Sequence, residues 1–475
     1  MARIHLALLP LLVGLSASFA PANPDSGFAA RWEAIKEETT PEQLYRLLYD
    51  LPKGGDLHTH FDGSFIPELL YRAATDPERN GGAEFFTRTK ILNCDPQPLP
   101  LVYYININRA TLEGLPACVQ EEFEPLADLS PEQQARWASS LKLDLAGEGR
   151  DEFFERHWTR LGQINTIDMK LTLLVENMQL FGAEGVRYLE YQLTPFGITD
   201  ADGHPAPPDA VADRIRERLR QPDALATGVT VRLQAASLRF TPDAEDRVRR
   251  NYAFVDRHRD LYVGVNLVGR EDNQKGYPLR FLNVFREMRR QYSGIGISLH
   301  AGEADDRDAA IHDSLLLGAT RIGHGLNLIR DPDTLLLMRN GPYLVEINLI
   351  SNRLLDYTPD LSLHPFPEYL RLGVPVCLNT DDRGMWDSTM TDEYYSAVTT
   401  FGLTWPEIVQ LGEDSLAYSF AEDAVKTRLI EDYRRRVDDF EDRYLSDDSL
   451  KRLEHIEPVA FGYAERTWGF DFKPF

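Results

Sequence analysis

Residues 295–303 are Ile295-Gly296-Ile297-Ser298-Leu299-His300-Ala301-Gly302-Glu303, an apolar run followed by a histidine and a carboxylic acid. If the apolar run is a buried strand, His300 lies at its C-terminal end. Glu303 then lies on the loop beyond, where Gly302 allows a sharp turn. One residue could hold a metal ion while the other handles protons at the same position. Taken alone, a His-x-x-Glu sequence is more often a surface or capping feature, so its meaning depends on the rest of the chain.

Apolar segments of strand length alternate with amphipathic segments of helix length along most of the chain. Eight strands are expected, around His58 and at Val186–Leu193, Val229–Leu238, Tyr262–Gly269, Ile295–Leu299, Arg321–Gly325, Tyr343–Asn348 and Val374–Asn379. Eight β/α units predict an α/β fold, a (β/α)8 TIM barrel with an insertion after the first strand and extra helices at both ends. An open doubly wound sheet is the alternative. It would usually carry a glycine-rich nucleotide loop, and the sequence has no convincing one.

Histidines and acids collect at the predicted C-terminal ends of strands, which form one rim in a barrel of this kind. His58 and His60 are two residues apart, so on a strand they face the same side. Together with His300 and Asp381 they offer three imidazoles and one carboxylate. That set suits one zinc ion or another borderline divalent ion. The alternatives are polar loop residues for the histidine pair and a surface turn for Asp381.

Three further residues would complete the chemistry at this rim. A bound ion with an open position would lower the pKa of a water there toward neutral. In an apolar site Glu303 could stay protonated and donate to a ring nitrogen as the neighbouring carbon is attacked. His324, which lies between two glycines, either orients the attacking hydroxide or starts a helix. Burying Asp382 beside Asp381 is unfavourable unless one binds a metal and the other accepts hydrogen bonds. The pattern indicates hydrolytic deamination or amide-like hydrolysis.

With these residues in place, the chain resembles the adenosine deaminase family of metal-dependent hydrolases. The matching motifs follow the family's order: Pro52-Lys53 with Asp56-Leu57-His58-Thr59-His60-Phe61-Asp62-Gly63, then His300-Ala301-Gly302-Glu303, Arg321-Ile322-Gly323-His324-Gly325, Ile350-Ser351-Asn352, Asn379-Thr380-Asp381-Asp382 and Asp414-Ser415-Leu416-Ala417-Tyr418-Ser419-Phe420. The resemblance implies a (β/α)8 barrel, one zinc ion, and hydrolysis of the 6-amino group of adenosine to give inosine and ammonia. We expect 2′-deoxyadenosine to be accepted as well.

The resemblance also implies a role for each site residue. It assigns zinc to His58, His60, His300 and Asp381. It assigns proton donation to Glu303, hydroxide positioning to His324, purine contacts to Gly269 and Asp382, and a position near the ribose to Asp62.

Two features are similar to the secreted, growth-factor-type branch of that family. They are Gly264-Val265-Asn266-Leu267-Val268-Gly269-Arg270-Glu271-Asp272 and the cysteine-bearing insertion. A longer helical extension supports dimerisation in that branch, so the short lead-in here leaves a homodimer open. Arg383 stands where the family typically has proline, which would change the loop over the base. The alternative function is therefore an amidohydrolase-type deaminase of a modified purine nucleoside or another aminated heterocycle. A third reading is a binding or signalling protein that uses the barrel as a scaffold.

The sequence also predicts where the protein is targeted and how the chain is divided into domains. Residues 1–20 have the pattern of a secretory signal peptide, with Arg3, an apolar run and a small-x-small site at Ser18-Phe19-Ala20. A membrane anchor is the alternative, but the apolar run is short for a span. Residues 21–50 should form a helical lead-in and residues 51–475 the deaminase barrel, with an insertion at about residues 76–149. Export predicts a periplasmic or extracellular protein without a membrane span after signal removal.

The net charge restricts the classes of binding partner, and the cysteines bear on the cellular compartment. A net charge of −24 disfavours nucleic acid, because phosphates would be repelled, and a small purine nucleoside is the expected partner. In an oxidising compartment Cys94 and Cys118 could form a disulfide; otherwise they are two free thiols. Cys377 lies in an apolar run and should be a buried small hydrophobe.

Overall fold

The computed structural model describes residues 27–304 and 308–472, so the predicted signal peptide at residues 1–20 lies outside the described residues. The helical lead-in consists of α1 (Gly27–Glu38) and α2 (Pro41–Asp50). A capping box starts α2: the Thr40 hydroxyl accepts from the Gln43 amide, and Pro41 occupies the first turn. Both helices pack against C-terminal helices, α1 beside α21 (Trp405–Ala417) and α2 beside α20 (Met390–Phe401).

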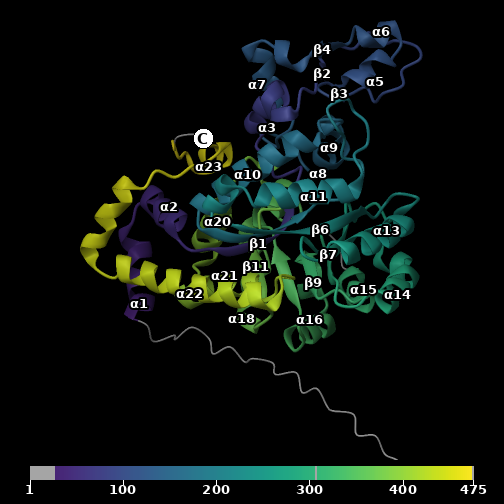
Figure 1. Cartoon of the computed structure of the whole chain (residues 1–475). Helices are drawn as coiled ribbons and strands as arrows, with labels where there is room; N and C mark the ends of the chain where they lie inside the picture. The colour runs from purple at the N-terminus through teal and green to yellow at the C-terminus, as the bar shows by residue number, and fades with distance from the viewer. Residues whose placement is uncertain (1–26, 305–307, 473–475) are drawn as a thin grey trace, which may run out of the picture.

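Within the described residues, eight strands form one parallel sheet in chain order. They are β1 (Gly54–His60), β5 (Val186–Gln192), β6 (Thr230–Leu238), β7 (Tyr262–Val268), β8 (Gly296–Ala301), β9 (Arg321–His324), β10 (Leu344–Ile347) and β11 (Val376–Leu378). The first and last strands meet at a bridge between Thr59 and Asp381. There the His60 amide donates to the Asp381 carbonyl at 3.0 Å, and the Asp381 amide donates to the His58 carbonyl at 2.9 Å. The sheet thus closes into the predicted (β/α)8 TIM barrel (Figure 1).

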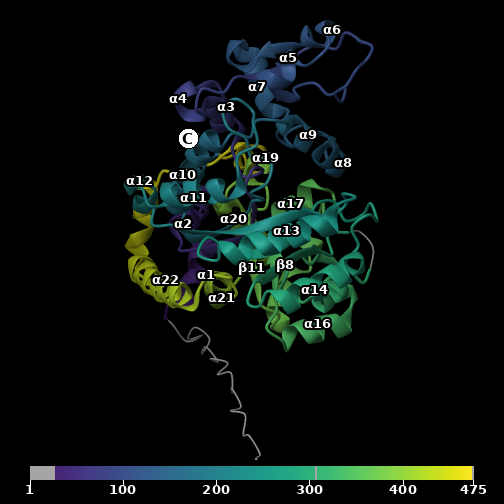
Figure 2. The same ribbon diagram turned by 45° about the vertical axis from the view of Figure 1, so that its right-hand side comes forward.

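Helices between the strands cover the outside of the barrel (Figure 2). They include α10 (Ile167–Ala183), α11 (Pro208–Leu219), α12 (Pro222–Ala226), α13 (Ala244–Arg257), α14 (Leu282–Gln291), α15 (Ala310–Leu317), α16 (Pro332–Arg339), α17 (Leu349–Leu354) and α18 (Phe366–Leu372). Covered on one face by helices and on the other by the barrel interior, the strands are largely buried; all residues of β7 are buried, whereas Leu238 at the end of β6 is exposed.

The last barrel strand is shorter than the sequence predicts. Val374–Asn379 was expected, but the ladder is confined to Val376–Leu378. Pro375 has no amide hydrogen to donate, although its carbonyl still accepts from the Val345 amide at 3.0 Å. The other predicted strands agree with the observed ones to within about two residues.

The insertion after β1 has its own small sheet and core. Strand β2 (Phe85–Arg88) pairs antiparallel with β3 (Asn106–Asn108) and β4 (Phe123–Pro125). Short helices accompany it: α3 (Pro67–Thr75), α4 (Pro77–Asn80), α5 (Arg109–Glu113), α6 (Ala117–Gln120) and α7 (Pro131–Ser139). Cys94 and Cys118 are joined by a disulfide bond, and Cys377 is a buried free thiol. The sheet and α5–α7 project from the barrel on the side of α3 (Figures 1 and 2).

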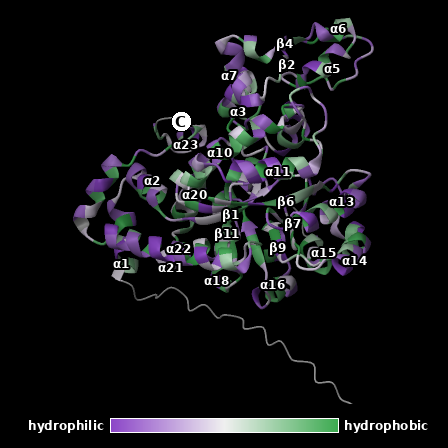
Figure 3. Cartoon of the chain, viewed as in Figure 1, coloured by the Kyte–Doolittle hydropathy of each residue, from purple (hydrophilic) through white to green (hydrophobic). Residues whose placement is uncertain are grey.

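C-terminal helices wrap the barrel and return toward the N-terminal lead-in. They are α19 (Arg383–Trp386), α20, α21, α22 (Asp423–Tyr444) and α23 (Gly462–Trp468). Hydrophilic residues predominate on the long α22 (Figure 3), while its buried side carries Leu429, Tyr433 and Phe440. No helix in residues 27–304 and 308–472 combines the length and apolar character that a membrane crossing requires.

Candidate active site

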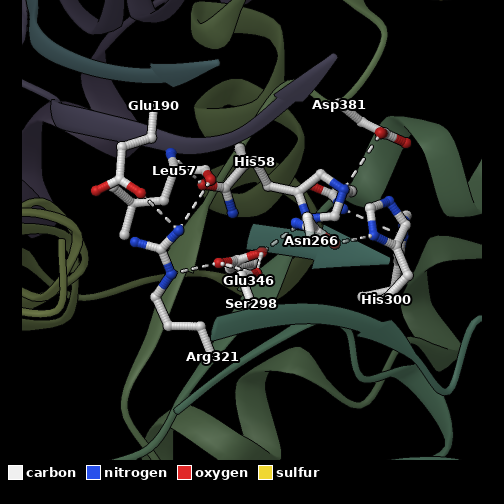
Figure 4. Close-up of polar contacts among 12 residues, drawn as sticks. Leu57, His58, Glu190, Asn266, Ser298, His300, Arg321, Glu346 and Asp381 are labelled. Atoms are coloured by element: carbon white, nitrogen blue, oxygen red, sulfur yellow. Dashed lines mark hydrogen bonds and ion pairs between the residues drawn. The ribbon is translucent and has the colours of Figure 1, made fainter. Parts of the chain in front are cut away.

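The four predicted metal ligands meet at the C-terminal rim of the barrel. His58 and His60 come from β1, His300 from β8, and Asp381 from the loop after β11. Their ligand atoms all lie within 4.8 Å of one another. The Nε2 atoms of His60 and His300 are 3.2 Å apart, and the Asp381 Oδ1 atom is 3.4 Å from His58 Nε2 and 3.2 Å from His60 Nε2. Residues far apart in sequence therefore form one cluster (Figure 4).

These side chains fit a divalent cation of the zinc class. His58 Nε2 and Asp381 Oδ1 are buried and have no hydrogen-bond partner, an unfavourable state that a shared cation would relieve. Three imidazole nitrogens and one carboxylate oxygen are donors that zinc accepts. Burial opposes ionisation of Asp381, but the nearby imidazoles of His58 and His60 hold its pKa well below the usual range. Asp381 also has a φ of 54°, a strained conformation that is typical of functional positions.

A buried ion-pair network orients the His58 ring. Its Nδ1 atom lies 2.8 Å from Glu346 Oε2, which fixes the ring so that Nε2 faces the cluster. Glu346 also accepts from the Ser298 hydroxyl at 3.0 Å and pairs with Arg321 Nε at 2.6 Å (Figure 4). The positive charge of Arg321 and the hydrogen bond from His58 keep the pKa of Glu346 low, against the effect of burial.

A second chain of hydrogen bonds orients His300 and joins the first. His300 Nδ1 lies 3.1 Å from Asn266 Oδ1, and the Asn266 amide donates to Gln234 at 2.9 Å. Gln234 donates to Glu190 at 3.0 Å, and Glu190 accepts from Arg321 at 2.8 Å (Figure 4). Two ligand imidazoles are thus linked through the barrel interior. Sequence reasoning missed this set; polar residues inside predicted buried strands were the signal that could have found it.

Glu303 lies beside this cluster on a loop held by another acid. The amides of Gly302 and Glu303 donate to the Glu271 carboxylate at 3.0 and 3.4 Å. Glu271 also pairs with the buried Arg239 at 3.6 Å. Burial and the negative charges of Asp381 and Glu271 raise the pKa of Glu303 well above the usual carboxyl range. The raised pKa favours the protonated, neutral form of this side chain, from which a proton can be donated.

His324 faces Glu303 across the same site. Its Nδ1 atom is 3.7 Å from Glu303 Oε1 and 3.1 Å from the Asn348 amide nitrogen. The Asn352 amide nitrogen lies 3.4 Å from the same Nδ1 atom; with the two amides as donors, the ring hydrogen is assigned to Nε2, where it is available to the site. The flanking Gly323 is required for space: a Cβ atom there would lie 2.6 Å from the His58 ring. The helix start considered for His324 is wrong, because it ends β9 with a φ of 64°.

A cavity of about 390 Å³ opens above these residues. The three predicted substrate contacts, Asp62, Gly269 and Asp382, all line it together with Glu303 and His324. Three aromatic side chains form one wall, Phe153, Phe154 and Trp158, and Leu238, Phe240 and Val268 contribute apolar surface. The sequence did not single out this wall, because aromatic residues at helical spacing usually indicate core packing.

Arg383 does not lie over the cavity, contrary to the expectation from sequence. It is buried, its guanidinium 3.0 Å from Glu184 and 4.1 Å from the centre of the Phe181 ring. Both partners belong to the C-terminal end of α10 or directly follow it. The loop after Asp382 is therefore anchored to the outer layer of helices, because a buried guanidinium needs an anionic partner.

Residues 151–435 match the family model described as adenosine deaminase. The chain belongs to the adenosine deaminase family. It is thus an enzyme of a metal-dependent hydrolase family. The match begins after the insertion, so it includes His300, His324 and Asp381 but neither His58 nor His60. In the structure β1 lies beside the loop after β11, which brings His58 and His60 to the other two ligands.

Similar proteins differ in the substrates that their names state. An adenine deaminase from Chelativorans sp. (strain BNC1) is 29% identical over 262 residues, 54% of this chain and 77% of that protein. An adenosine deaminase from Vibrio parahaemolyticus is 35% identical over 179 residues, 38% of this chain and 52% of that protein. The enzyme thus spans between about half and three quarters of these relatives.

Two solved structures share the fold. An Arabidopsis N6-mAMP deaminase aligns with a TM-score of 0.59 at 20% identity, covering 82% of this chain and 99% of that chain. An amidohydrolase from Burkholderia ambifaria with bound Zn aligns with a TM-score of 0.57 at 19% identity, covering 86% of this chain and 96% of that chain. At this identity the likeness establishes the barrel alone.

Proposed function

We propose that the enzyme hydrolyses the 6-amino group of adenosine, and of 2′-deoxyadenosine, to give inosine or deoxyinosine and ammonia. The observation that carries the proposal is the position of a buried carboxyl group with a raised pKa, Glu303, beside a cluster of metal-type ligands at the floor of one cavity. Deamination of a purine requires protonation of the ring and attack by water at the adjacent carbon, and this site offers the groups for both.

The proposed cofactor is one zinc ion held by His58, His60, His300 and Asp381. When bound, such an ion supplies Lewis-acid activation, which lowers the pKa of the attacking water. The protein's part is to hold the four donors in place through Glu346 and the hydrogen bonds of Asn266.

Glu303 is proposed as the general acid. Its raised pKa keeps the proton that a purine ring nitrogen accepts as electron density moves onto the ring. His324 is proposed to orient the attacking water through its Nε2 hydrogen. Its ring is fixed by the Asn348 amide at Nδ1. Burial lowers the pKa of His324 to about 3, so the ring stays neutral and keeps a defined tautomer.

The remaining cavity residues support a purine nucleoside as the substrate. Asp382 is buried with a raised pKa, caused by burial and by the charge of Asp381, so it can donate a hydrogen bond to the base. Asp62 pairs with Lys170 near the outer part of the cavity, where a ribose hydroxyl could bind. The aromatic wall provides an apolar face for a planar ring.

A nucleoside fits the charge of this cavity better than a nucleotide. Among the lining residues that the structure describes, Arg247 is the only arginine or lysine, and it already pairs with Asp243 at 2.9 Å. A 5′-phosphate near Asp62 would add negative charge to a cavity that carries several carboxyl groups. The alternative substrate, a modified purine nucleoside or another aminated heterocycle, gains no support from Arg383, because that residue lies away from the cavity.

A substrate panel with metal-replete protein tests the proposal. Adenosine, 2′-deoxyadenosine, N6-methyladenosine, adenine and AMP would be compared by ammonia release and by the shift of the ultraviolet band. We expect the highest kcat/KM for adenosine or 2′-deoxyadenosine, and at least tenfold lower values for adenine and AMP. Turnover of only adenine, AMP or the N6-methyl compound would contradict the proposed substrate, and turnover of none would contradict the proposed activity.

Export is also proposed, on the pattern of residues 1–20, with the disulfide as support because such bonds persist in oxidising compartments. N-terminal sequencing of the protein from culture supernatant or periplasm should give a mature start after Ala20. A protein that still begins with Met1 and is found inside the cell would contradict export. The relation to the growth-factor-type branch, the homodimer and the domain bounds remain predictions of the sequence.

A further inference from the structure

A second cluster of ligand-type side chains lies outside the cavity, where the insertion returns to the barrel. Glu148, Glu152 and His157 each offer one ligand atom, and these atoms lie within 4.8 Å of one another. Glu152 ends α8 (Arg150–Glu152), and His157 ends a π-helical turn (Phe153–His157) that continues into α9 (Trp158–Leu161). These short helices lie between the insertion and the barrel (Figures 1 and 2).

The π-helical turn brings Glu152 and His157 together. In an α-helix, residues five apart point in directions that differ by roughly 140°, because each residue advances about 100°. In a π-helical turn the hydrogen bonds join residues five apart, so these positions share one face. The chain between Phe153 and His157 thus adopts an uncommon geometry whose effect is to align a carboxylate with an imidazole.

His157 is buried without a partner. Its side chain has 0% exposure, and neither Nδ1 nor Nε2 makes a hydrogen bond. A buried imidazole with two unsatisfied nitrogens is unfavourable, and in native proteins such a group usually has a partner. Burial, with the charge of Arg160 nearby, also lowers its pKa to about 3, which leaves a neutral ring with a free lone pair.

The two carboxylates have capacity left for a cation. Glu148 accepts backbone hydrogen bonds from Asp144 at 3.1 Å and Leu145 at 3.0 Å, both on Oε2, so Oε1 remains for another partner. Burial and the negative charges of Asp144 and Glu152 raise the pKa of Glu148. Glu152 pairs with Arg156 and Arg160, each at 2.9 Å. Each Glu152 oxygen keeps a further lone pair beside its arginine, through which it can also bind a cation.

We propose that Glu148, Glu152 and His157 bind a second divalent cation of the zinc class, distinct from the ion at the cavity floor. One imidazole nitrogen and two carboxylate oxygens are donors that zinc accepts. The ion would give His157 its missing partner and remove the repulsion between Glu148 and Glu152.

The proposed site and the aromatic wall of the active-site cavity share one π-helical turn, because Phe153 and Phe154 lie between Glu152 and His157 in the sequence. Trp158 follows His157, lines the cavity, and packs with its ring centre 6.0 Å from that of His60. Phe153 starts the π-helical turn and contacts Trp158 at 6.1 Å between ring centres. An ion here would fix the wall that faces the substrate, so its loss should raise KM more than it lowers kcat.

Metal counting tests the site. The full chain would be stripped with a chelator, refilled with Zn²⁺ alone, passed through a desalting column and analysed for bound zinc. We expect two equivalents per chain for the unaltered protein and one each for His157→Gln and Glu148→Gln. His300→Ala should also lose one equivalent, the one at the cavity floor, and His300→Ala with His157→Gln should bind none.

A matched control and a folding check complete the experiment. Glu155→Gln changes an exposed acid on the same segment and should keep two equivalents. Circular dichroism and Tm would show whether each variant folds. If His157→Gln does not fold, the zinc content of Glu148→Gln decides the question. One equivalent in the unaltered protein, or two in Glu148→Gln, would overturn the proposal. Because the readout is bound zinc, the result is independent of which nucleoside the enzyme deaminates.

Discussion

Arg383 and Glu184 form a buried ion pair whose charged atoms are 3.0 Å apart, on the outer side of the loop that carries Asp381 and Asp382. Glu184 also accepts hydrogen bonds from Thr391 at the start of α20, at 2.8 Å from the amide and 3.1 Å from the hydroxyl. The pair therefore connects α10, the loop after β11 and α20. This arrangement gives Arg383 a structural role at a position where a role in substrate choice was expected.

Replacing Arg383 should reduce stability without changing substrate preference. Arg383→Met removes one partner of a buried ion pair and leaves the Glu184 carboxylate without its cation. We expect the free energy of unfolding to fall by about 3–5 kcal/mol. Urea unfolding would measure it, and the substrate panel would show the same order of kcat/KM. Arg435→Met, which changes an arginine with 66% side-chain exposure, serves as the control and should have little effect. A changed substrate order at unchanged stability would contradict this role.

Replacing Glu303 should remove proton donation and keep the metal site. Glu303→Gln preserves size and still accepts or donates hydrogen bonds, but it has no acidic proton. We expect kcat to fall by about 10²–10⁴, with the zinc content of the cavity-floor site unchanged. Steady-state kinetics and metal analysis on the same preparation check both. If the activity remained within about threefold of the unaltered enzyme, another group would have to be the acid.

Glu346 should control metal affinity, although it does not contact the cluster centre directly. Glu346→Gln removes the negative charge that faces His58 Nδ1 at 2.8 Å and weakens the orientation of that ring. We expect the zinc affinity of the cavity-floor site to fall by about 10–100-fold, measured by competition with a chromophoric chelator. Ser298→Ala is the matched control, since it removes only a hydroxyl donor to the same carboxylate. Equal affinities for the two variants would show that the charge is unimportant.

Asp414 should make stability depend on pH in the weakly acidic range. Burial raises its pKa from 3.8 to about 7, despite hydrogen bonds from Gln410 and from the backbone of Val376. Between about pH 4 and 7 the folded protein holds a proton at Asp414 that the unfolded chain has released. Stability therefore falls as the pH rises through this range, by up to about 1.4 kcal/mol per pH unit from this group. Above the folded pKa the contribution no longer changes.

Asp414→Asn does not titrate and should flatten that dependence. Urea unfolding at pH 5, 6 and 7 would compare it with the unaltered enzyme and with Asp333→Asn, an exposed substitution on α16. Identical slopes for Asp414→Asn and the unaltered enzyme would contradict the raised pKa.

The barrel and its ligands could be predicted because both follow from local patterns. Buried strands appear as short apolar runs, and parallel strand ends lie on one rim, so His58, His300 and Asp381 could be placed together without coordinates. Asp62, Gly269 and Asp382 lie on the cavity as expected.

The parts that could not be predicted depend on contacts distant in sequence. The role of Glu346 depends on β10, which places it against His58, a residue 288 positions earlier in the sequence. Arg383 appeared to face the substrate because its neighbour does, and only the packing of α10 shows that its side chain turns the other way. The π-helical turn before Trp158 has no reliable sequence pattern, so the position of the aromatic wall could not be predicted either.

The bridge between β1 and β11 has a consequence for how the enzyme is made. His58 and His60 are synthesised early, but Asp381 and the strand that closes the ring emerge more than three hundred residues later. A nascent chain on the ribosome thus exposes two histidines that have neither their carboxylate nor their neighbouring strand. Barrel closure and completion of the ligand cluster are therefore the same late event, and the part of the chain that leaves the ribosome first has neither a closed barrel nor a complete site.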